Sequence, residues 1–359
     1  MSSWMSRATA GLGLALLLAG CASIGPRTVM RDRFDFGTAV AESWKQQTLL
    51  AIVKLRYLDV PVFLDVGQIV SGYTLETGVD LSGQIAPVTR SGDTFGALGG
   101  HSIFTDRPTI TYTPLTGDKF LRGLMSPIPT ASILYTLQTG YAADFVLAWT
   151  VESLNGRHNR SNMPGPARTA DPVFVRALEL MRELQAAGSV TLGVRHDERT
   201  GESTVAVFRR GDQPPDIQAK STELRRLLGL PTEQAQFSVV TSTAPGPKGE
   251  LAMQPRSLLQ ILQAVAAFVE IPPEHLAQEW ASPSAPMAAD ESAIFGIQIR
   301  SARQKPQQSY AAVRYKGHWF WIDESDWRTK RTLVLVILLF TLTDSGKPER
   351  LPVLTIPAN

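Results

Sequence analysis

The chain has 359 residues, of which 43% are hydrophobic; 35 are Lys or Arg, 33 are Asp or Glu, and one is Cys. This hydrophobic content is normal for a folded globular chain, and the length is sufficient for one large core or two medium ones. The formal net charge of +2 argues against nucleic acid or an electrostatically bound membrane surface as the main partner. A single Cys excludes an intramolecular disulfide.

The segment nearest the N-terminus is the most informative. Arg7 precedes an apolar run over residues 10–19, which ends in Leu18-Ala19-Gly20-Cys21. A basic start, a short apolar segment and small residues before a cut site are typical of a secretory signal. The run is too short to span a bilayer, which needs roughly 20 residues. The pattern resembles a bacterial lipobox, which implies cleavage between Gly20 and Cys21 and diacylation of Cys21.

The lipobox resemblance also restricts the chemistry and the location that we expect. An acylated Cys21 leaves no free thiol, so cysteine nucleophiles and thiolate metal sites are excluded. Ala22 follows Cys21, whereas an Asp at that position would favour retention in the inner membrane of a lipoprotein. The resemblance therefore implies a lipid-anchored protein of the outer membrane that faces the periplasm.

Four segments are expected along the chain: a signal peptide over 1–20, an acylated N-terminus and tether over 21–33, and two subdomains. The first, over 34–160, is predicted to be α/β and to contain a long loop at 83–106, because that stretch is rich in Gly, Ser and Thr without a period. The second, over 171–359, is predicted to be α+β. The polar, Gly- and Pro-rich residues 155–170 separate the two.

Periodicity and capping signals predict the secondary structure in chain order. Helices are expected at 35–57, 133–154, 172–188, 221–229, 257–270 and 326–342. Strands are expected at 60–66, 69–75, 109–112, 236–241, 293–300 and 352–356, and hairpins at 189–209 and 310–322. The apolar run over 332–342 is 11 residues long and predicts a buried core element rather than a membrane span. The mixed order indicates an α+β fold with a largely antiparallel sheet and at least two β-hairpins.

The hairpin over 310–322 is the most distinctive local feature. A two-residue turn at Lys316-Gly317 would place Arg314 opposite Trp319, close enough for a cation–π contact. One face of the hairpin is then apolar and faces the core. The other carries Tyr310, Arg314, Trp319 and Trp321. Partner and sugar sites often use such side chains, but a helix that covers this face would explain the pattern equally.

Other side chains that could act in catalysis or metal binding also have structural explanations. Three carboxylates, Asp323, Glu324 and Asp326, could bind a cation or act in acid–base chemistry, but they also stand where negative charge stabilises the start of the next helix. None of the five histidines (His101, His158, His196, His275 and His318) stands at a metal-motif spacing. Nucleophile motifs such as G-x-S-x-G and the phosphate-binding P-loop motif are absent. We expect no metal and no cofactor.

Two further segments show a resemblance. The first is Lys54-Leu55-Arg56-Tyr57 with Pro61-Val62-Phe63-Leu64-Asp65-Val66; the second is Val313-Arg314-Tyr315 with Trp319-Phe320-Trp321-Ile322-Asp323 and Thr329-Lys330-Arg331. Together with the lipobox, they resemble a family of uncharacterised lipoproteins of Gram-negative bacteria. That family carries no assigned activity, so the resemblance implies an envelope lipoprotein and transfers no catalytic residue.

The sequence favours a non-enzymatic protein that binds an envelope protein partner or scaffolds an assembly, with Tyr310, Arg314, Trp319 and Trp321 as the binding residues. One alternative is a periplasmic hydrolase acting on cell-wall or polysaccharide material, which would need Asp323, Asp326, His318 or Glu270 to converge in a cleft. Another is a carrier of lipid or a small ligand, with a large apolar cavity. Partner identity and oligomeric state stay open.

Overall fold

The structure is a computed structural model, and it describes residues 25–70, 72–83, 96–161, 168–197, 201–209, 211, 213–247, 249–283, 287 and 289–343. The chain forms two compact units. The smaller unit comprises Met1–Ser43 and Leu64–Pro114, and the larger comprises Trp44–Phe63 and Leu115–Asn359. Helices and mixed sheets with antiparallel hairpins confirm the predicted α+β class.

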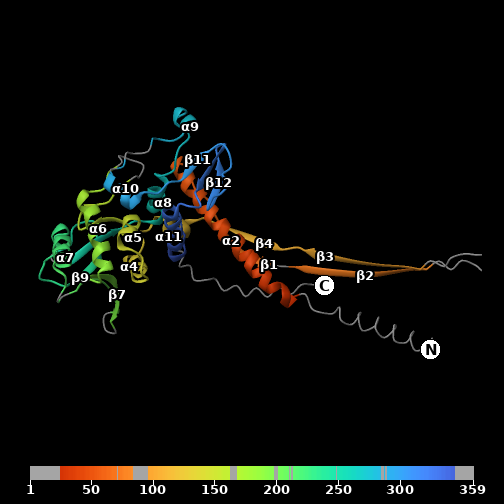
Figure 1. Cartoon of the computed structure of the whole chain (residues 1–359), viewed down its shortest axis with the longest axis horizontal. Coiled ribbons are helices and arrows are strands. Elements are labelled where there is room, and N and C mark those ends of the chain that lie inside the picture. Colours follow the sequence, from red (N-terminus) through yellow and green to blue (C-terminus); the bar gives the residue numbers. More distant parts are fainter. Residues whose placement is uncertain are drawn as a thin grey trace, which may run out of the picture. The chain divides into compact units, whose positions relative to one another are not determined.

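The smaller unit is dominated by paired strands, shown in Figure 1. The elements of this part of the chain are α2 (Gly25–Arg56), β1 (Phe63–Val70), β2 (Tyr73–Gly83), β3 (Gly96–Asp106) and β4 (Thr109–Leu115). β1 pairs with β4, and β2 pairs with β3 in a long antiparallel ribbon whose register runs from Tyr73 opposite Asp106 to Gly83 opposite Gly96.

This ribbon corrects the loop predicted at 83–106. Residues 96–106 are a strand, while 84–95 lie outside the described residues. The Gly- and Ser-rich sequence has no alternation of apolar and polar side chains, so the periodicity test had no signal to detect. Antiparallel pairing depends on main-chain N–H and C=O groups, which every residue except Pro supplies in full.

The start of α2 corrects the predicted tether. α2 covers Gly25–Arg56, so residues 25–33 are helical, while residues 21–24 lie outside the described part of the chain. No Gly or Pro stands between Pro26 and Gly37, so nothing in the local sequence interrupts the helix.

The larger unit contains most of the elements, with the C-terminal half of α2. Its helices are α3 (Asp118–Met125), α4 (Thr130–Gln138), α5 (Ala143–Thr150), α6 (Pro172–Ala186), α7 (Pro215–Leu227), α8 (Leu258–Ala266), α9 (Pro273–Ala277), α10 (Ala289–Phe295) and α11 (Trp327–Thr343). Its strands are β5 (Val151–Leu154), β6 (Arg157–His158), β7 (Val190–Asp197), β8 (Gly201–Phe208), β9 (Gln236–Thr241), β10 (Glu250–Pro255), β11 (Arg300–Ala302), β12 (Ala311–Tyr315) and β13 (His318–Ile322).

Two sheets organise these elements. The first has six strands in the order β6-β5-β10-β9-β8-β7, and its pairs are antiparallel except for β9 with β10. The second has three antiparallel strands in the order β11-β13-β12. Helix α4 packs on β7, β8 and β9, and α6 contacts both α5 and α7 (Figure 1).

The six-stranded sheet overturns the predicted boundary at 155–170. β5 lies before that segment and β10 begins 80 residues after its end, at Glu250, yet the two strands pair directly, with Met253 opposite Leu154. Both therefore belong to one compact unit, and the division of the chain falls instead at 43/44, 63/64 and 114/115. The polar Gly- and Pro-rich segment is therefore a loop within one unit, because the strands on either side of it, β5 and β10, pair with each other.

The helix predicted at 133–154 is three elements rather than one. α4 ends near Gly140, whose φ of +98° lies in the left-handed region where a helix commonly stops. α5 follows at Ala143, and the final residues leave the helix to form β5 against β10. The apolar periodicity of a helix continues through this region, so the sequence did not show where the helix ends. The pairing of β5 with β10, about 100 residues later in the chain, sets that end.

The centre of the larger unit is apolar and aromatic. Trp149 on α5 is 1% exposed and makes edge-to-face contacts with Phe268 and Phe295 at 5.9 and 5.7 Å between ring centroids. Every residue of α5 except Asp144 is buried. Edge-to-face pairs of this kind add about 0.5–1.5 kcal/mol each beyond the burial of their area.

The late apolar run forms a helix whose inner face belongs to the core, as predicted, while Val334, Leu338 and Leu342 are exposed. On α11, five apolar side chains that include Val336 and Phe340 are at most 4% exposed. In the part of the chain that the structure describes, no helix combines the length and apolar character needed to cross a membrane.

Candidate functional site

The hairpin of β12 and β13 has the register predicted from its sequence. Lys316 and Gly317 both have positive φ values, of 44° and 83°, as a two-residue type I′ turn requires. Arg314 then pairs with Trp319, and Tyr315 with His318. The predicted apolar face is also confirmed, since Ala311, Val313, Phe320 and Ile322 are buried.

β11 extends the opposite face into a third strand. Trp321 on the central strand β13 stands between Arg300 of β11 and Ala312 of β12, while Trp319 stands between Ala302 and Arg314. Directly paired residues project from the same face of a sheet. This tryptophan face therefore carries two half-buried indoles, Trp319 and Trp321, flanked by two exposed arginines, Arg300 and Arg314.

The cations near these rings differ from the prediction. Lys305, rather than Arg314, lies over the Trp319 ring, with its Nζ 5.3 Å from the centroid. Tyr310 is not an open part of the face, because the ammonium groups of Lys45 and Lys330 stand 4.5 and 4.9 Å from its ring. The candidate surface left by these contacts consists of Arg300, Lys305, Arg314, Trp319 and Trp321.

A second cluster, which the sequence did not predict, lies on the core face of the same hairpin. The rings of His275 and His318 meet edge to face at 4.7 Å. The Tyr57 hydroxyl is hydrogen-bonded to His275 Nδ1 at 2.7 Å, and His318 Nε2 lies 2.9 Å from a carboxylate oxygen of Glu274. More than 200 residues separate Tyr57 from His275, so no local spacing could have indicated this contact.

Burial affects the protonation of His275. Loss of water lowers the pKa of His275, and the neighbouring His318 lowers it further. Burial also raises the pKa of Tyr57 to about 12. His275 is thus favoured in its neutral form, in which one ring nitrogen accepts a hydrogen bond and the other donates one.

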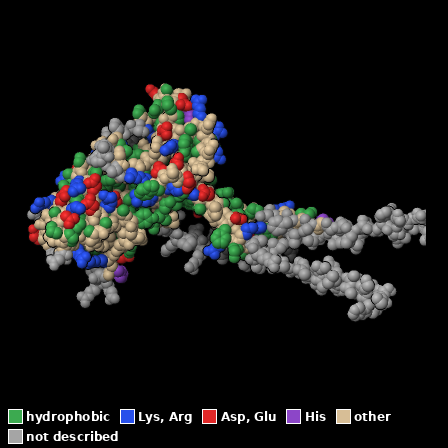
Figure 2. Space-filling model, viewed as in Figure 1, with side chains coloured by type: hydrophobic (Ala, Val, Ile, Leu, Met, Phe, Trp, Pro, Cys, Tyr) green, Lys and Arg blue, Asp and Glu red, His purple; other side chains and the backbone are tan. Residues whose placement is uncertain are grey.

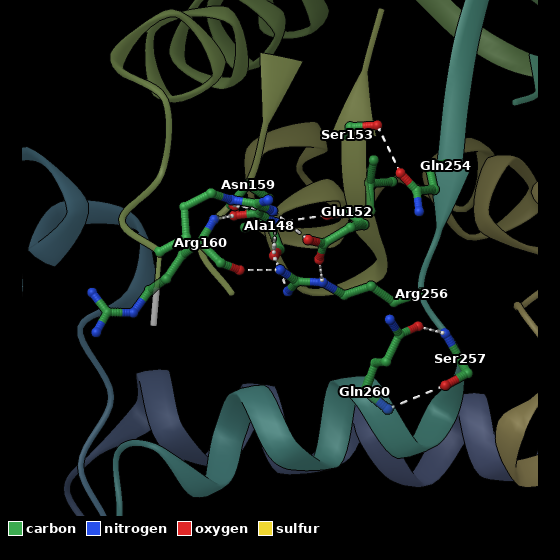
Figure 3. A network of polar contacts seen from close by, with 11 residues as sticks. Ala148, Glu152, Ser153, Asn159, Arg160, Gln254, Arg256, Ser257 and Gln260 are labelled. Atoms are coloured by element: carbon green, nitrogen blue, oxygen red, sulfur yellow. Dashed lines mark hydrogen bonds and ion pairs between the residues drawn. The ribbon is translucent and has the colours of Figure 1, made fainter. Parts of the chain in front are cut away.

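A buried ionic network joins β5 and β6 to the residues that precede α8, as Figure 3 shows. Arg256 is 3% exposed; its Nε donates to Glu152 at 2.9 Å, and its other nitrogens donate to the backbone oxygens of Ala148 and Arg160. Arg168 reaches the second Glu152 oxygen at 2.5 Å. Each carboxylate oxygen therefore has an arginine donor, which makes this a structural network.

Arg160 takes part in a second buried pair, and its guanidinium points away from Arg256 in Figure 3. Its Nη1 lies 2.8 Å from Glu291 Oε2, and both side chains are at most 5% exposed. The other Glu291 oxygen accepts the backbone N–H of Ala170 at 2.6 Å. Glu291 thereby ties α10 to the chain just before α6.

The residues named for a hydrolase are engaged in separate contacts. Asp326 accepts the backbone N–H and hydroxyl of Thr329 and so caps α11, as predicted. Hydrogen bonds from Ser325, with a smaller contribution from the Arg300 charge, lower the pKa of Asp323. His318 bonds Glu274, and Glu270 accepts the backbone N–H of Ser301. These contacts are those of caps, turns and the core.

Charge on the surface is mixed. In the view of Figure 2, basic and acidic side chains are interspersed over the described parts of the larger unit, in keeping with the near-neutral sequence. Among the described residues, no group of three His, Cys, Asp or Glu side chains is placed to hold a metal ion. The predicted lipidation and cleavage residues, Cys21 and Gly20, lie outside those residues.

No protein-family model, curated protein or solved structure matches this chain. Its function is therefore argued from its own residues. Of the surfaces described above, the tryptophan face is the one that combines large rings with cations left accessible to solvent.

Proposed function

We propose that this protein is a lipid-anchored component of the outer membrane that binds an envelope protein through its tryptophan face. The observation that carries the proposal is the placement of Trp319 and Trp321 between the exposed Arg300 and Arg314 on one face of a three-stranded sheet. Trp and Arg are the residues most enriched among those that dominate binding energies at protein interfaces.

The charge of the face specifies the partner's chemistry. Arg300, Lys305 and Arg314 supply three cations around two indole rings. A complementary surface would place carboxylates opposite the arginines, which bind them through two parallel hydrogen bonds, and an apolar or aromatic patch against the rings. The proposed anchor at Cys21 would keep this face near one membrane, where such a partner would be embedded or attached.

The test is a double substitution, Trp319→Ala with Trp321→Ala, in the full chain expressed in its own envelope. Truncation of an interface tryptophan commonly costs 2 kcal/mol or more of binding free energy, about a thirtyfold loss for each residue. Crosslinking in cells followed by mass spectrometry should show that proteins captured by the unsubstituted chain are no longer captured. The variant must retain the circular dichroism and melting temperature of the parent.

Two control variants separate the face from the anchor. Trp280→Ala removes another partly exposed tryptophan of the larger unit and should leave the captured proteins unchanged. Cys21→Ser should abolish lipidation and release the protein from the membrane while preserving partner binding in solution. An unchanged partner set in the double variant would refute the binding proposal; unchanged processing and membrane attachment of Cys21→Ser would refute the anchor.

A further inference from the structure

A second candidate site lies in the larger unit. A pocket of about 190 Å³ opens among α5, α6, α11 and the segment over 294–297. At about 30 Å³ for each water in the liquid, it has room for roughly six waters, or for one small polyatomic ion. The residues that line it are Ala142, Asp144, Phe145, Arg182, Ile294, Gly296, Ile297, Trp327, Arg328, Arg331 and Thr332.

The charged side chains of this pocket do not balance. Arg182 comes from α6, and Arg328 and Arg331 come from successive turns of α11, where residues three apart share a face. Among the described residues that line the pocket, Asp144 on α5 is the single carboxylate, and its Oδ2 lies 3.4 Å from Arg182 Nε. Three guanidinium groups and one carboxylate leave a formal charge of +2 around the pocket.

Arg331 is held in place before any ligand arrives. Its guanidinium carbon lies 3.7 Å from the centroid of the Phe145 ring and 5.1 Å from that of Trp327. Its Nε atom is buried and has no hydrogen-bond partner among the described residues. A buried donor without a partner costs about 1–3 kcal/mol, and a charged one more, so an acceptor that entered the pocket would recover that free energy.

Burial and a neighbouring positive charge also make the charged form of Arg331 unfavourable, which again favours an anionic ligand. Burial lowers the pKa of Arg331, the Asp144 charge opposes this effect, and the Arg328 charge adds to it. The guanidinium stays charged even so, because an arginine holds its proton far above neutral pH. Only added negative charge would relieve the repulsion between Arg328 and Arg331.

We propose that this pocket binds the dianionic phosphate group of a small ligand. Guanidinium groups match the oxygens of phosphate with pairs of parallel hydrogen bonds, and two negative charges neutralise the formal charge of the pocket. Phe145, Trp327 and Ile294 supply apolar walls beside the guanidinium groups, and a local dielectric constant below that of water strengthens those hydrogen bonds. The same phosphate chemistry occurs in inorganic phosphate and in the monoester headgroup of phosphatidic acid.

The test is calorimetric titration of the full chain in detergent with inorganic phosphate and, separately, with the soluble lipid dihexanoyl phosphatidic acid. Saturable binding of at least one is expected. Binding should weaken as the pH falls from 7.5 to 5.5, because the dianion takes up a proton over this range, near pH 6 for a phosphate monoester and at a somewhat higher pH for inorganic phosphate. Binding of phosphate alone identifies a free ion as the ligand, whereas tighter binding of the lipid identifies a headgroup.

Variants locate the site. Arg331→Gln and Arg328→Gln should each weaken binding by about tenfold or more, the value of one charge-assisted hydrogen bond. Arg122→Gln removes the same charge from an exposed pair with Asp118 on α3 and should leave the affinity unchanged. Melting temperatures verify that all three variants fold.

Three outcomes would overturn the proposal. The first is the absence of saturable binding of either probe at 10 mM, which is on the order of ten times a weak millimolar dissociation constant. The second is an unaltered affinity in Arg331→Gln. The third is a loss of affinity in Arg122→Gln equal to that in Arg331→Gln. The proposal stands apart from the tryptophan face, because neither Trp319 nor Trp321 lines this pocket.

Discussion

Two groups of arginines in the larger unit have opposite surroundings. In the network around Arg256 and Arg160, each guanidinium faces a carboxylate: Arg256 bonds Glu152, and Arg160 bonds Glu291. In the pocket beside α11, three guanidinium groups share one carboxylate, and Arg331 Nε has no acceptor in the part of the chain that the structure describes. Arg256 and Arg160 are each paired with a carboxylate inside the fold, whereas Arg331 lines a pocket.

The difference shows how burial and pairing together separate structural from binding roles. A charge that is almost wholly removed from water must be paired within the fold, since an isolated buried ion costs several kcal/mol. A charge at the wall of an open pocket keeps part of its hydration, so the fold tolerates it without a partner. Three experiments test this distinction.

The largest effect is expected for Glu152→Gln. This substitution keeps the shape of the side chain but leaves the guanidinium of Arg256 buried without its carboxylate, which should lower the free energy of unfolding by about 3–5 kcal/mol. Urea denaturation of the full chain measures the change. Glu223→Gln is the matched control, because its partner Arg176 is partly exposed, and it should cost less than about 1 kcal/mol.

The second experiment extends the comparison to a buried group that can give up its proton. Since burial lowers the pKa of His275, the unfolded chain binds this proton more readily. Stability from His275 is therefore present above the ordinary histidine pKa of about 6.5 and is lost as the pH falls through the lowered value.

His275→Gln should flatten this dependence between pH 7.5 and 5.5, by no more than the limit of about 1.4 kcal/mol per pH unit for one proton. Urea denaturation at several pH values provides the measurement. His196→Gln, at an exposed position of β7, should leave the slope as it is. A slope that persists in His275→Gln would mean that another group is responsible.

The smallest effect is expected for Arg331→Gln in the absence of any phosphate. Removing a charge that lies near Arg328 and has little pairing should change the free energy of unfolding by less than about 1 kcal/mol. The same substitution at Arg160 leaves Glu291 buried without its partner and should cost about 3 kcal/mol or more. Equal losses in the two variants would remove the distinction between the groups.

Local signals predicted much of this molecule. The capping box of Ser257 and Gln260, the N-cap Asp171 before Pro172 and the I′ turn at Lys316-Gly317 all form as their residues indicate. Each involves atoms within a few residues of one another, so its geometry follows from short-range hydrogen bonds and backbone preferences. The face of the hairpin that carries the two tryptophans was predictable for the same reason.

Contacts between distant residues escaped that reasoning. β10 was not predicted, although it lies between β5 and β9 and completes the six-stranded sheet. The segment predicted as a strand at 293–300 begins in the last turn of helix α10, which ends at Phe295, and β11 begins only at Arg300. Short apolar stretches are compatible with helix and strand alike, and the neighbouring strand decides between them.

The sequence by itself determined the α+β class, the buried inner face of the helix over 327–343, and the pairing of Arg314 with Trp319, because all three depend on periodicity and short loops. It also supplied the lipobox resemblance, which stays a prediction. Only the tertiary structure decided which charges meet. Arg182 and Arg331 are 149 positions apart in the chain, yet they line one pocket, since long-range packing places α6 beside the start of α11.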